Sequence, residues 1–280
     1  MIQELFRIGP IVISPFGVML VLAFFSGYLQ LKRGMKRLGV GDEEDASSIL
    51  FAAGVGGILG AKIYYAILYG DWHLLLDRSG LVWYGGFLLA TAAVFWVIRR
   101  RQLPIWPLLD AATPALALGY AVGRIGCFLV GDDYGRPSDL PWAVAFANGL
   151  PPTTAGYLRS EFGVAIPAGI PDDQLLRVHP TQLYETLLAA GIAWFGWRLL
   201  CGPRGRQAGR TALAVFAGLA LERFAVEFVR AKDDRFFAGL TLAQAISLAI
   251  LLLLAGLWAG RRKGWSRDVP PVVAGPGRLR

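Results

Sequence analysis

Charged side chains are scarce in this sequence. They make up 17% of the 280 residues, against roughly 25% in an ordinary soluble domain, so a soluble globular fold is not expected. There are only two cysteines, Cys127 and Cys201, and we expect them near opposite faces of a membrane, which excludes a disulfide framework. CxxC and HExxH arrangements are also absent, and we expect neither a metal nor an organic cofactor.

Long apolar runs take the place of the missing charge. Hydrophobic residues make up 55% of the chain and its mean hydropathy is +0.49, which predicts an all-α polytopic membrane protein. We place these runs within one transmembrane domain, residues 1–267, and expect the Pro- and Gly-rich residues 268–280 to form a disordered cytoplasmic tail. The seven predicted spans are residues 11–31, 47–69, 81–98, 106–131, 180–200, 211–230 and 239–260.

Basic residues cluster after alternate spans and predict how the chain is oriented. The connections after the first, third, fifth and seventh spans are rich in Lys and Arg, whereas the others hold few, such as Arg78 alone. By the positive-inside rule the basic connections are cytoplasmic, so the N-terminus lies outside and the C-terminus inside. The net charge of +8 therefore predicts membrane orientation rather than a nucleic-acid partner. The first span is not a cleavable signal peptide, because its basic cluster follows the apolar segment.

One connection is too long to be a simple turn. Residues 132–179 lie outside the predicted spans, and we expect them to form a small extracytoplasmic head, with a short strand at Trp142–Phe146. No internal repeat is evident, which argues against an inverted-repeat transporter. The seventh span has no lysine for a retinal Schiff base, which argues against a photoreceptor.

Ionisable residues inside the predicted spans are the main functional signal. Each costs roughly 2.5–3.5 kcal/mol at the bilayer centre, so such residues usually line a cavity. Lys62, Arg124 and Arg223 each lie about seven residues from the outer end of a span, or on the order of 10 Å below the outer surface. This common depth predicts a cationic chamber in the outer leaflet. For Lys62, snorkelling towards the interface is the alternative.

The sixth span carries a charged face. Arg223, Glu227 and Arg230 are spaced i, i+4 and i+7, so they share one face of a helix. Glu227 can orient Arg223, although an ion pair without any substrate explains the spacing equally well. In the fourth span Gly123 and Gly126 flank Arg124, where they allow close backbone approach or a break in the helix.

Three motifs stand out: Gly123-Arg124-Ile125-Gly126 with the following Gly131-Asp132 and Gly135-Arg136, then His179-Pro180-Thr181-Gln182-Leu183-Tyr184-Glu185, and finally Arg223-Phe224-Ala225-Val226-Glu227-Phe228-Val229-Arg230. Together they resemble the prolipoprotein diacylglyceryl transferase family of bacterial inner membranes. Weaker similarities to the same family lie at Gly60-Ala61-Lys62, at Trp83-Tyr84-Gly85-Gly86 and at Ser14-Pro15-Phe16-Gly17.

The resemblance implies seven helices with the N-terminus outside and a periplasmic head between helices four and five. It also implies an activity: transfer of the diacylglyceryl group of phosphatidylglycerol to the lipobox cysteine thiol of a preprolipoprotein, the first step of lipoprotein maturation. The expected partners are therefore phosphatidylglycerol, preprolipoprotein signal peptides and membrane lipid.

The resemblance also implies residue roles. The catalytic group would be Arg124, Arg223, Glu227, Tyr84 and Asp132, the last where the family usually has a glutamate. Phosphatidylglycerol would contact Arg124, Arg223, Lys62, Cys127, Gly135, Arg136 and Arg230. His179, Gln182, Tyr184 and Glu185 would form a structural motif that fixes the head to the fifth helix, and the paired carboxylates Asp132 and Asp133 would hold no metal.

Three exchanges depart from the usual family pattern. Tyr84 stands where many members have a histidine, and an unperturbed tyrosine, with a pKa of about 10, is a poor base at neutral pH. Cys127 replaces an asparagine, and Lys62 replaces an arginine and its bidentate fork. These exchanges motivate an alternative function, in which the protein binds phospholipid or lipoprotein without transfer.

Overall fold

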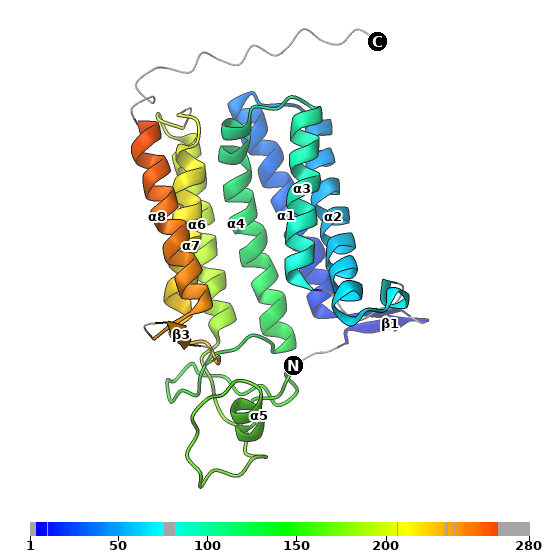
Figure 1. The fold of residues 1–280 in the computed structure, drawn as a ribbon, viewed down its shortest axis with the longest axis vertical. Coiled ribbons are helices and arrows are strands. Elements are labelled where there is room, and N and C mark those ends of the chain that lie inside the picture. Colours follow the sequence, from blue (N-terminus) through cyan, green and yellow to red (C-terminus); the bar gives the residue numbers. More distant parts are fainter. Residues whose placement is uncertain are drawn as a thin grey trace.

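The structure is a computed structural model that describes residues 4–9, 11–75, 82–205, 207–232, 235–237 and 239–262. Most of these residues are helical (Figure 1). The predicted tail, residues 268–280, lies outside the described residues. The long helices are α1 (Pro15–Leu38), α2 (Glu43–Tyr69), α3 (Trp83–Arg100), α4 (Ile105–Val130), α6 (Thr181–Cys201), α7 (Arg210–Val226) and α8 (Leu242–Arg262).

Shorter elements lie between these helices or before the first of them. A 3-10 turn, η1, spans Trp72–Leu75, and a short helix, α5, spans Ala155–Ser160. Strand β1 (Phe6–Ile8) pairs antiparallel with β2 (Ile11–Ile13), and β3 (Arg235–Phe237) pairs antiparallel with β4 (Leu240–Thr241).

Four helices, α1, α2, α4 and α8, are long and apolar enough to cross a membrane. The described chain is thus an all-α membrane protein, as its composition predicts. The remaining long helices are shorter or more polar: α3 has 18 residues, α7 has 17, and α6 buries Gln182 and Glu185.

The predicted sixth span, residues 211–230, is wrong at its end. Helix α7 stops at Val226, four residues early, and Arg230 instead forms an isolated antiparallel bridge with Gly135 in the head. The pairing with the head takes the chain out of the helix.

The first turn of α7 is capped by a residue of another helix. The carboxylate of the buried Asp110 of α4 accepts hydrogen bonds from the amide N–H groups of Gly209 at 2.6 Å and Ala212 at 2.7 Å.

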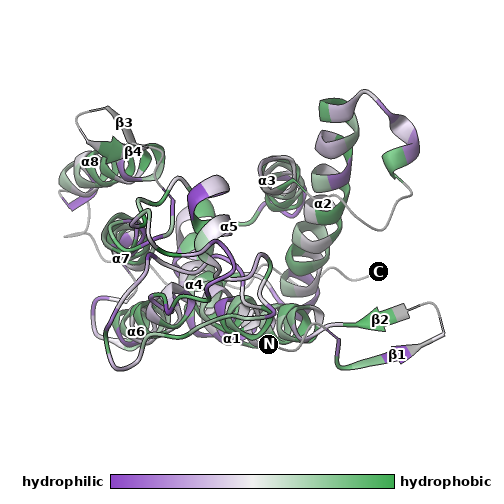
Figure 2. Cartoon of the chain, turned by 90° about the horizontal axis from the view of Figure 1, so that it is seen from below, coloured by the Kyte–Doolittle hydropathy of each residue, from purple (hydrophilic) through white to green (hydrophobic). Residues whose placement is uncertain are grey.

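Apolar packing is concentrated in the half of the bundle away from the head. Helix α1 packs on α4, α2 packs on α3, and α7 packs on α4, α6 and α8. Viewed from the head end, α7 and α8 lie side by side, and the helices are coloured mainly as hydrophobic (Figure 2). One core joins residues such as Met35, Ile49 and Leu108, and a smaller core joins Ala117, Ala193 and Val215. The head ends of α4, α6 and α7 carry charged residues instead.

The segment between α4 and α6 forms a small head at one end of the bundle (Figure 1). Its core includes Tyr134, Phe146, Leu158 and Val178. The strand predicted at Trp142–Phe146 does not form. Val144 alone bridges to Val178, because the amide of Phe146 donates to the Oγ1 of Thr153 at 3.0 Å and turns the chain away.

Candidate active site

A cavity of about 670 Å³ opens where the head meets the bundle. Its charged wall comes from α4, α6 and the end of α7, and its apolar wall comes from α7 and α8. Arg124 and Arg223, the two arginines singled out in the sequence, both line it. The lining residues that matter below are Tyr84, Tyr120, Arg124, Asp133, Glu185, Glu222, Arg223, Glu227, Arg230 and Lys232.

Glu185 is the centre of the charged wall. Its side chain is only 1% exposed, and one carboxylate oxygen pairs with Nη2 of Arg124. The other lies 3.7 Å from Nη1 of Arg223 and 3.6 Å from Nη1 of Arg230. This carboxylate therefore joins three cations from two helices and the segment after α7. The family resemblance implied a structural role in fixing the head, whereas in the structure Glu185 lies in the wall of the cavity.

The end of α7 supplies the second carboxylate. Nη2 of Arg223 lies 2.8 Å from Glu227, whose side chain is 2% exposed, and Nε of Arg230 lies 3.8 Å from the same oxygen. Because α7 ends at Val226, Arg223 lies three residues from the helix end rather than seven. Arg124 and Arg223 nevertheless lie close together, because both pair with Glu185 and both line the same cavity.

Asp133, which the sequence did not single out as a ligand of the arginines, completes the ion-pair network. Its two oxygens lie 3.0 Å from Nη1 of Arg124 and 2.7 Å from Nη2 of Arg230. Its backbone is left-handed, with φ of 56°, and its carbonyl accepts the Thr181 hydroxyl at 2.7 Å. Burial opposes ionisation, but Arg230 and Arg124 outweigh it and hold the pKa of Asp133 below its usual range.

Asp132, the predicted catalytic carboxylate, is not a lining residue of this cavity. Its Oδ1 is buried without a hydrogen-bond partner among the described residues. Burial and the neighbouring charge of Asp133 raise the pKa of Asp132. Its backbone carbonyl accepts the side-chain amide of Gln182, so Gln182 ties the start of the head to α6.

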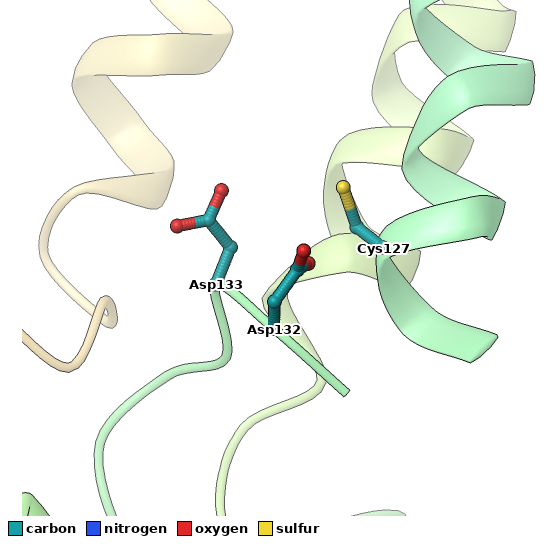
Figure 3. Close-up of side chains that lie close together, drawn as sticks. All are labelled: Cys127, Asp132 and Asp133. Carbon is teal, nitrogen blue, oxygen red and sulfur yellow. The ribbon is translucent and has the colours of Figure 1, made fainter. Parts of the chain in front are cut away.

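Cys127, Asp132 and Asp133 lie together at the end of α4 (Figure 3). Their ligand atoms are within 4.8 Å of one another, close enough to suggest a metal site. The same corner already contains a cation, because Nη1 of Arg124 lies 3.3 Å from the sulfur of Cys127 and also pairs with Asp133. A divalent ion would face this guanidinium and that of Arg230, so the residues do not suit a metal.

Four predicted lipid contacts, Lys62, Cys127, Gly135 and Arg136, are not among the residues that line the cavity. The amide of Gly135 donates to the carbonyl of His179 at 2.8 Å, and a Cβ on Gly135 would lie 2.5 Å from the carbonyl oxygen of Val229. Nε of Arg136 donates to the carbonyl of Arg230 at 3.1 Å. These two residues connect the head to the segment that carries Arg230.

The other residues of the second motif lie at the junction of head and α6. Nδ1 of His179 lies 3.2 Å from the hydroxyl of Tyr184, and the same hydroxyl accepts the indole N–H of Trp142 at 2.7 Å.

The glycines beside Arg124 do not break α4. Gly126 packs against α1, where an added Cβ would be 3.0 Å from the Cβ of Met19. Helix α4 continues unbroken through Gly123 and Gly126, so the helix break considered from the sequence does not occur.

The lining residues that escaped the sequence reasoning include Asp133, Glu222 and Tyr120. Glu222 is an ionisable residue inside a predicted span, so the criterion that selected Arg223 would also have selected it. Asp133 is adjacent to Asp132, and only the turn after α4 decides which of the two faces the arginines. Tyr120 has no distinguishing sequence signal.

Comparison with known proteins agrees with the family that the motifs resemble. The family model described as Prolipoprotein diacylglyceryl transferase matches residues 3–259. The chain belongs to the prolipoprotein diacylglyceryl transferase family. The match covers α1 through most of α8 and so includes every residue of the charged wall.

Curated relatives match along nearly their whole length. A protein of Stenotrophomonas maltophilia is 34% identical over 286 residues, which cover 95% of this chain and 94% of the relative. A protein of Vibrio cholerae is 29% identical over 272 residues, covering 92% and 91%. A protein of Geobacter sulfurreducens is 29% identical over 260 residues, covering 89% and 90%. All three are named phosphatidylglycerol–prolipoprotein diacylglyceryl transferase.

Proposed function

We propose that this protein transfers the diacylglyceryl group of phosphatidylglycerol to the lipobox cysteine thiol of preprolipoproteins, releasing glycerol phosphate. The observation that carries the proposal is the cavity that Arg124 and Arg223 share, inside a chain that matches the transferase family over residues 3–259. The relatives carry that activity in their names.

The two walls of the cavity suit the two parts of a phospholipid. The α7 and α8 wall includes Phe216, Leu219, Leu242, Ile246 and Ile250, which can contact acyl chains without desolvating polar groups. The opposite wall carries the arginines, which can hold a phosphodiester through charge-assisted hydrogen bonds.

The arginines have the chemistry that the reaction needs. When sulfur attacks the glyceryl carbon, the C–O bond to phosphate breaks and the leaving oxygen takes the electron pair. Arg124 and Arg223 stabilise that developing negative charge. Glu227, 2.8 Å from Arg223, holds this guanidinium in place. Glu185 orients Arg124 and Arg230 in the same way, so the cations are positioned before substrate binds.

The reaction also requires a particular orientation in the membrane. We infer that all seven long helices span a bacterial inner membrane, with the head and N-terminus periplasmic and the C-terminus cytoplasmic. Arginines at the helix ends away from the head support this: Arg100 lies over the Trp96 ring, Arg198 over Trp194 and Arg261 over Trp106. Such arginine and tryptophan pairs suit a cytoplasmic interface.

The test uses purified protein, phosphatidylglycerol vesicles and a lipobox peptide, with glycerol phosphate release and peptide mass as readouts. We expect Arg124→Ala and Arg223→Ala each to reduce transfer by about 10²–10³-fold, as loss of a transition-state donor does. Arg101→Ala is the matched control, because Arg101 pairs with Glu44 far from the cavity. Full transfer by both cavity variants would remove the proposed chemistry, and wild-type binding without any transfer would favour the phospholipid- or lipoprotein-binding alternative.

A further inference from the structure

Glu222 is the buried carboxyl group that the chemistry above does not use. It lies on α7 immediately before Arg223, lines the same cavity and is 5% exposed. Its Oε1 is buried and has no hydrogen-bond partner among the described residues. Burying a carboxyl oxygen in this state is unfavourable, so its retention inside a reactive cavity calls for a role.

The charges around Glu222 are already matched to each other. Arg124 pairs with Asp133 and Glu185, Arg223 with Glu185 and Glu227, and Arg230 with all three of these carboxylates. Within the part of the chain that the structure describes, no ion pair involves Glu222. A carboxylate engaged by several guanidinium groups is a weak proton acceptor, and an unengaged one is a much better one.

The surroundings of Glu222 come from four elements. Helix α4 and the turn after it contribute Tyr120, Arg124 and Asp133, and helix α6 contributes Glu185. Helix α7 with its following segment contributes Arg223, Glu227, Arg230 and Lys232. From α8 the lining residues, Leu242, Ala243, Ile246, Ser247 and Ile250, are all uncharged. Glu222 thus lines a cavity that has both the arginines and the apolar residues of α8 in its walls, so it can reach a substrate that contacts both.

We propose that Glu222 is the group that accepts the proton of the lipobox thiol, a role for which this chain lacks the usual histidine at position 84. The inference rests on the proposed transferase function. The thiol gives its proton to the Glu222 carboxylate as the S–C bond to the glyceryl carbon forms. The C–O bond to phosphate breaks and its electron pair stays on the phosphate oxygen. Glu222 then returns the proton to glycerol phosphate or to water, which restores the carboxylate and balances the reaction.

The experiment compares transfer rates of wild type and Glu222→Gln between pH 6.5 and pH 8.5. Glutamine keeps the shape and cannot accept the proton, so we expect a loss of about 10²–10⁴-fold at pH 6.5. A free thiol has a pKa of about 8.5, so its thiolate fraction rises roughly 50-fold over this range. The ratio of wild-type to variant rate should therefore fall by a similar factor as the pH rises, because the variant depends on thiol that ionises by itself.

Two further variants keep the inference falsifiable. Glu44→Gln, at the far end of α2, should match wild type at every pH. Glu222→Asp should be slower but keep the shallow pH profile of wild type, and it serves as the test if the glutamine variant does not fold. A rate ratio for Glu222→Gln that is independent of pH, or an aspartate variant with the steep profile of a free thiol, overturns the role of Glu222. A wild-type protein without transfer overturns the proposed function instead.

Discussion

At the scale of single residues, the site depends on carboxylates that hold arginines. Glu185 engages three guanidinium groups from a position that is 1% exposed, so its loss would leave buried cations uncompensated. Such a network stabilises the arrangement of the site more than the fold as a whole, because desolvation of the ions offsets much of their attraction. Its benefit is that the cations need little reorganisation when phosphate arrives.

The adjacent aspartates should respond oppositely to neutralisation. Asp133 has a pKa held below its usual range, so its contribution is present above about pH 4 and is lost as the pH falls through its folded value. We expect Asp133→Asn to lose about 1–2 kcal/mol at pH 7, a modest value because the side chain is 47% exposed. The difference from wild type should close as the pH falls below 4, in thermal melts of the detergent-solubilised protein.

Asp132→Asn is the matched comparison. Burial raises the pKa of Asp132, so its ionised form opposes folding at neutral pH, and this penalty disappears below the unfolded pKa of about 4. The variant should therefore melt above wild type at pH 7 and alongside it at acidic pH. A destabilised Asp132→Asn at pH 7 would show that the hydrogen bond with Cys127 and the attraction of Arg124 and Arg230 outweigh the cost of burial.

At the scale of elements, glycines decide how closely α2 and α3 approach. A Cβ on Gly60 would lie 2.2 Å from the carbonyl oxygen of Gly85, and one on Gly85 would lie 2.2 Å from the Cβ of Tyr64. Neither position can accept a side chain unless the backbones separate. This close approach also places Tyr84, the residue before Gly85, at the edge of the cavity.

We therefore expect Gly85→Ala to destabilise the protein by about 1–3 kcal/mol through overpacking and to reduce transfer by moving Tyr84. Gly57→Ala, on the facing helix α2, is the control, since a Cβ at Gly57 has no neighbour within 4 Å and alanine favours helix by roughly 0.5–1 kcal/mol. Thermal melting and transfer assays check both. Equal stability of the two variants would contradict the close contact of α2 and α3.

At the scale of the whole molecule, the head and the basic helix ends should lie on opposite sides of the membrane. In a Cys201→Ser background, a cysteine introduced in place of Asp173 in the head should react with a membrane-impermeant maleimide once the outer membrane is permeabilised. A cysteine at Pro203, in the connection between α6 and α7, should react only after the inner membrane is permeabilised. Labelling of both or of neither in intact spheroplasts would contradict the proposed topology.

Much of this architecture follows from local sequence. Apolar runs predicted every long helix that the structure describes, and four of these are long and apolar enough to cross a bilayer, which takes about 20 residues. Buried charge predicted Arg124, Arg223 and Glu227, since each is too costly to retain without a purpose. The resemblance to the transferase family rests on the same short motifs and is confirmed by the family match over residues 3–259.

Only the tertiary structure decided which charges meet. The turn after α4 turns Asp133 rather than Asp132 towards the arginines, the bridge between Gly135 and Arg230 ends α7 at Val226, and packing brings Glu185 and Glu222 into one cavity. The spacing of residues along the sequence shows which of them share a face of one helix, but not which neighbouring helix that face contacts. Hydropathy and charge alone therefore determined the membrane fold and the kind of chemistry, whereas the partners of each buried ion depend on contacts between distant segments.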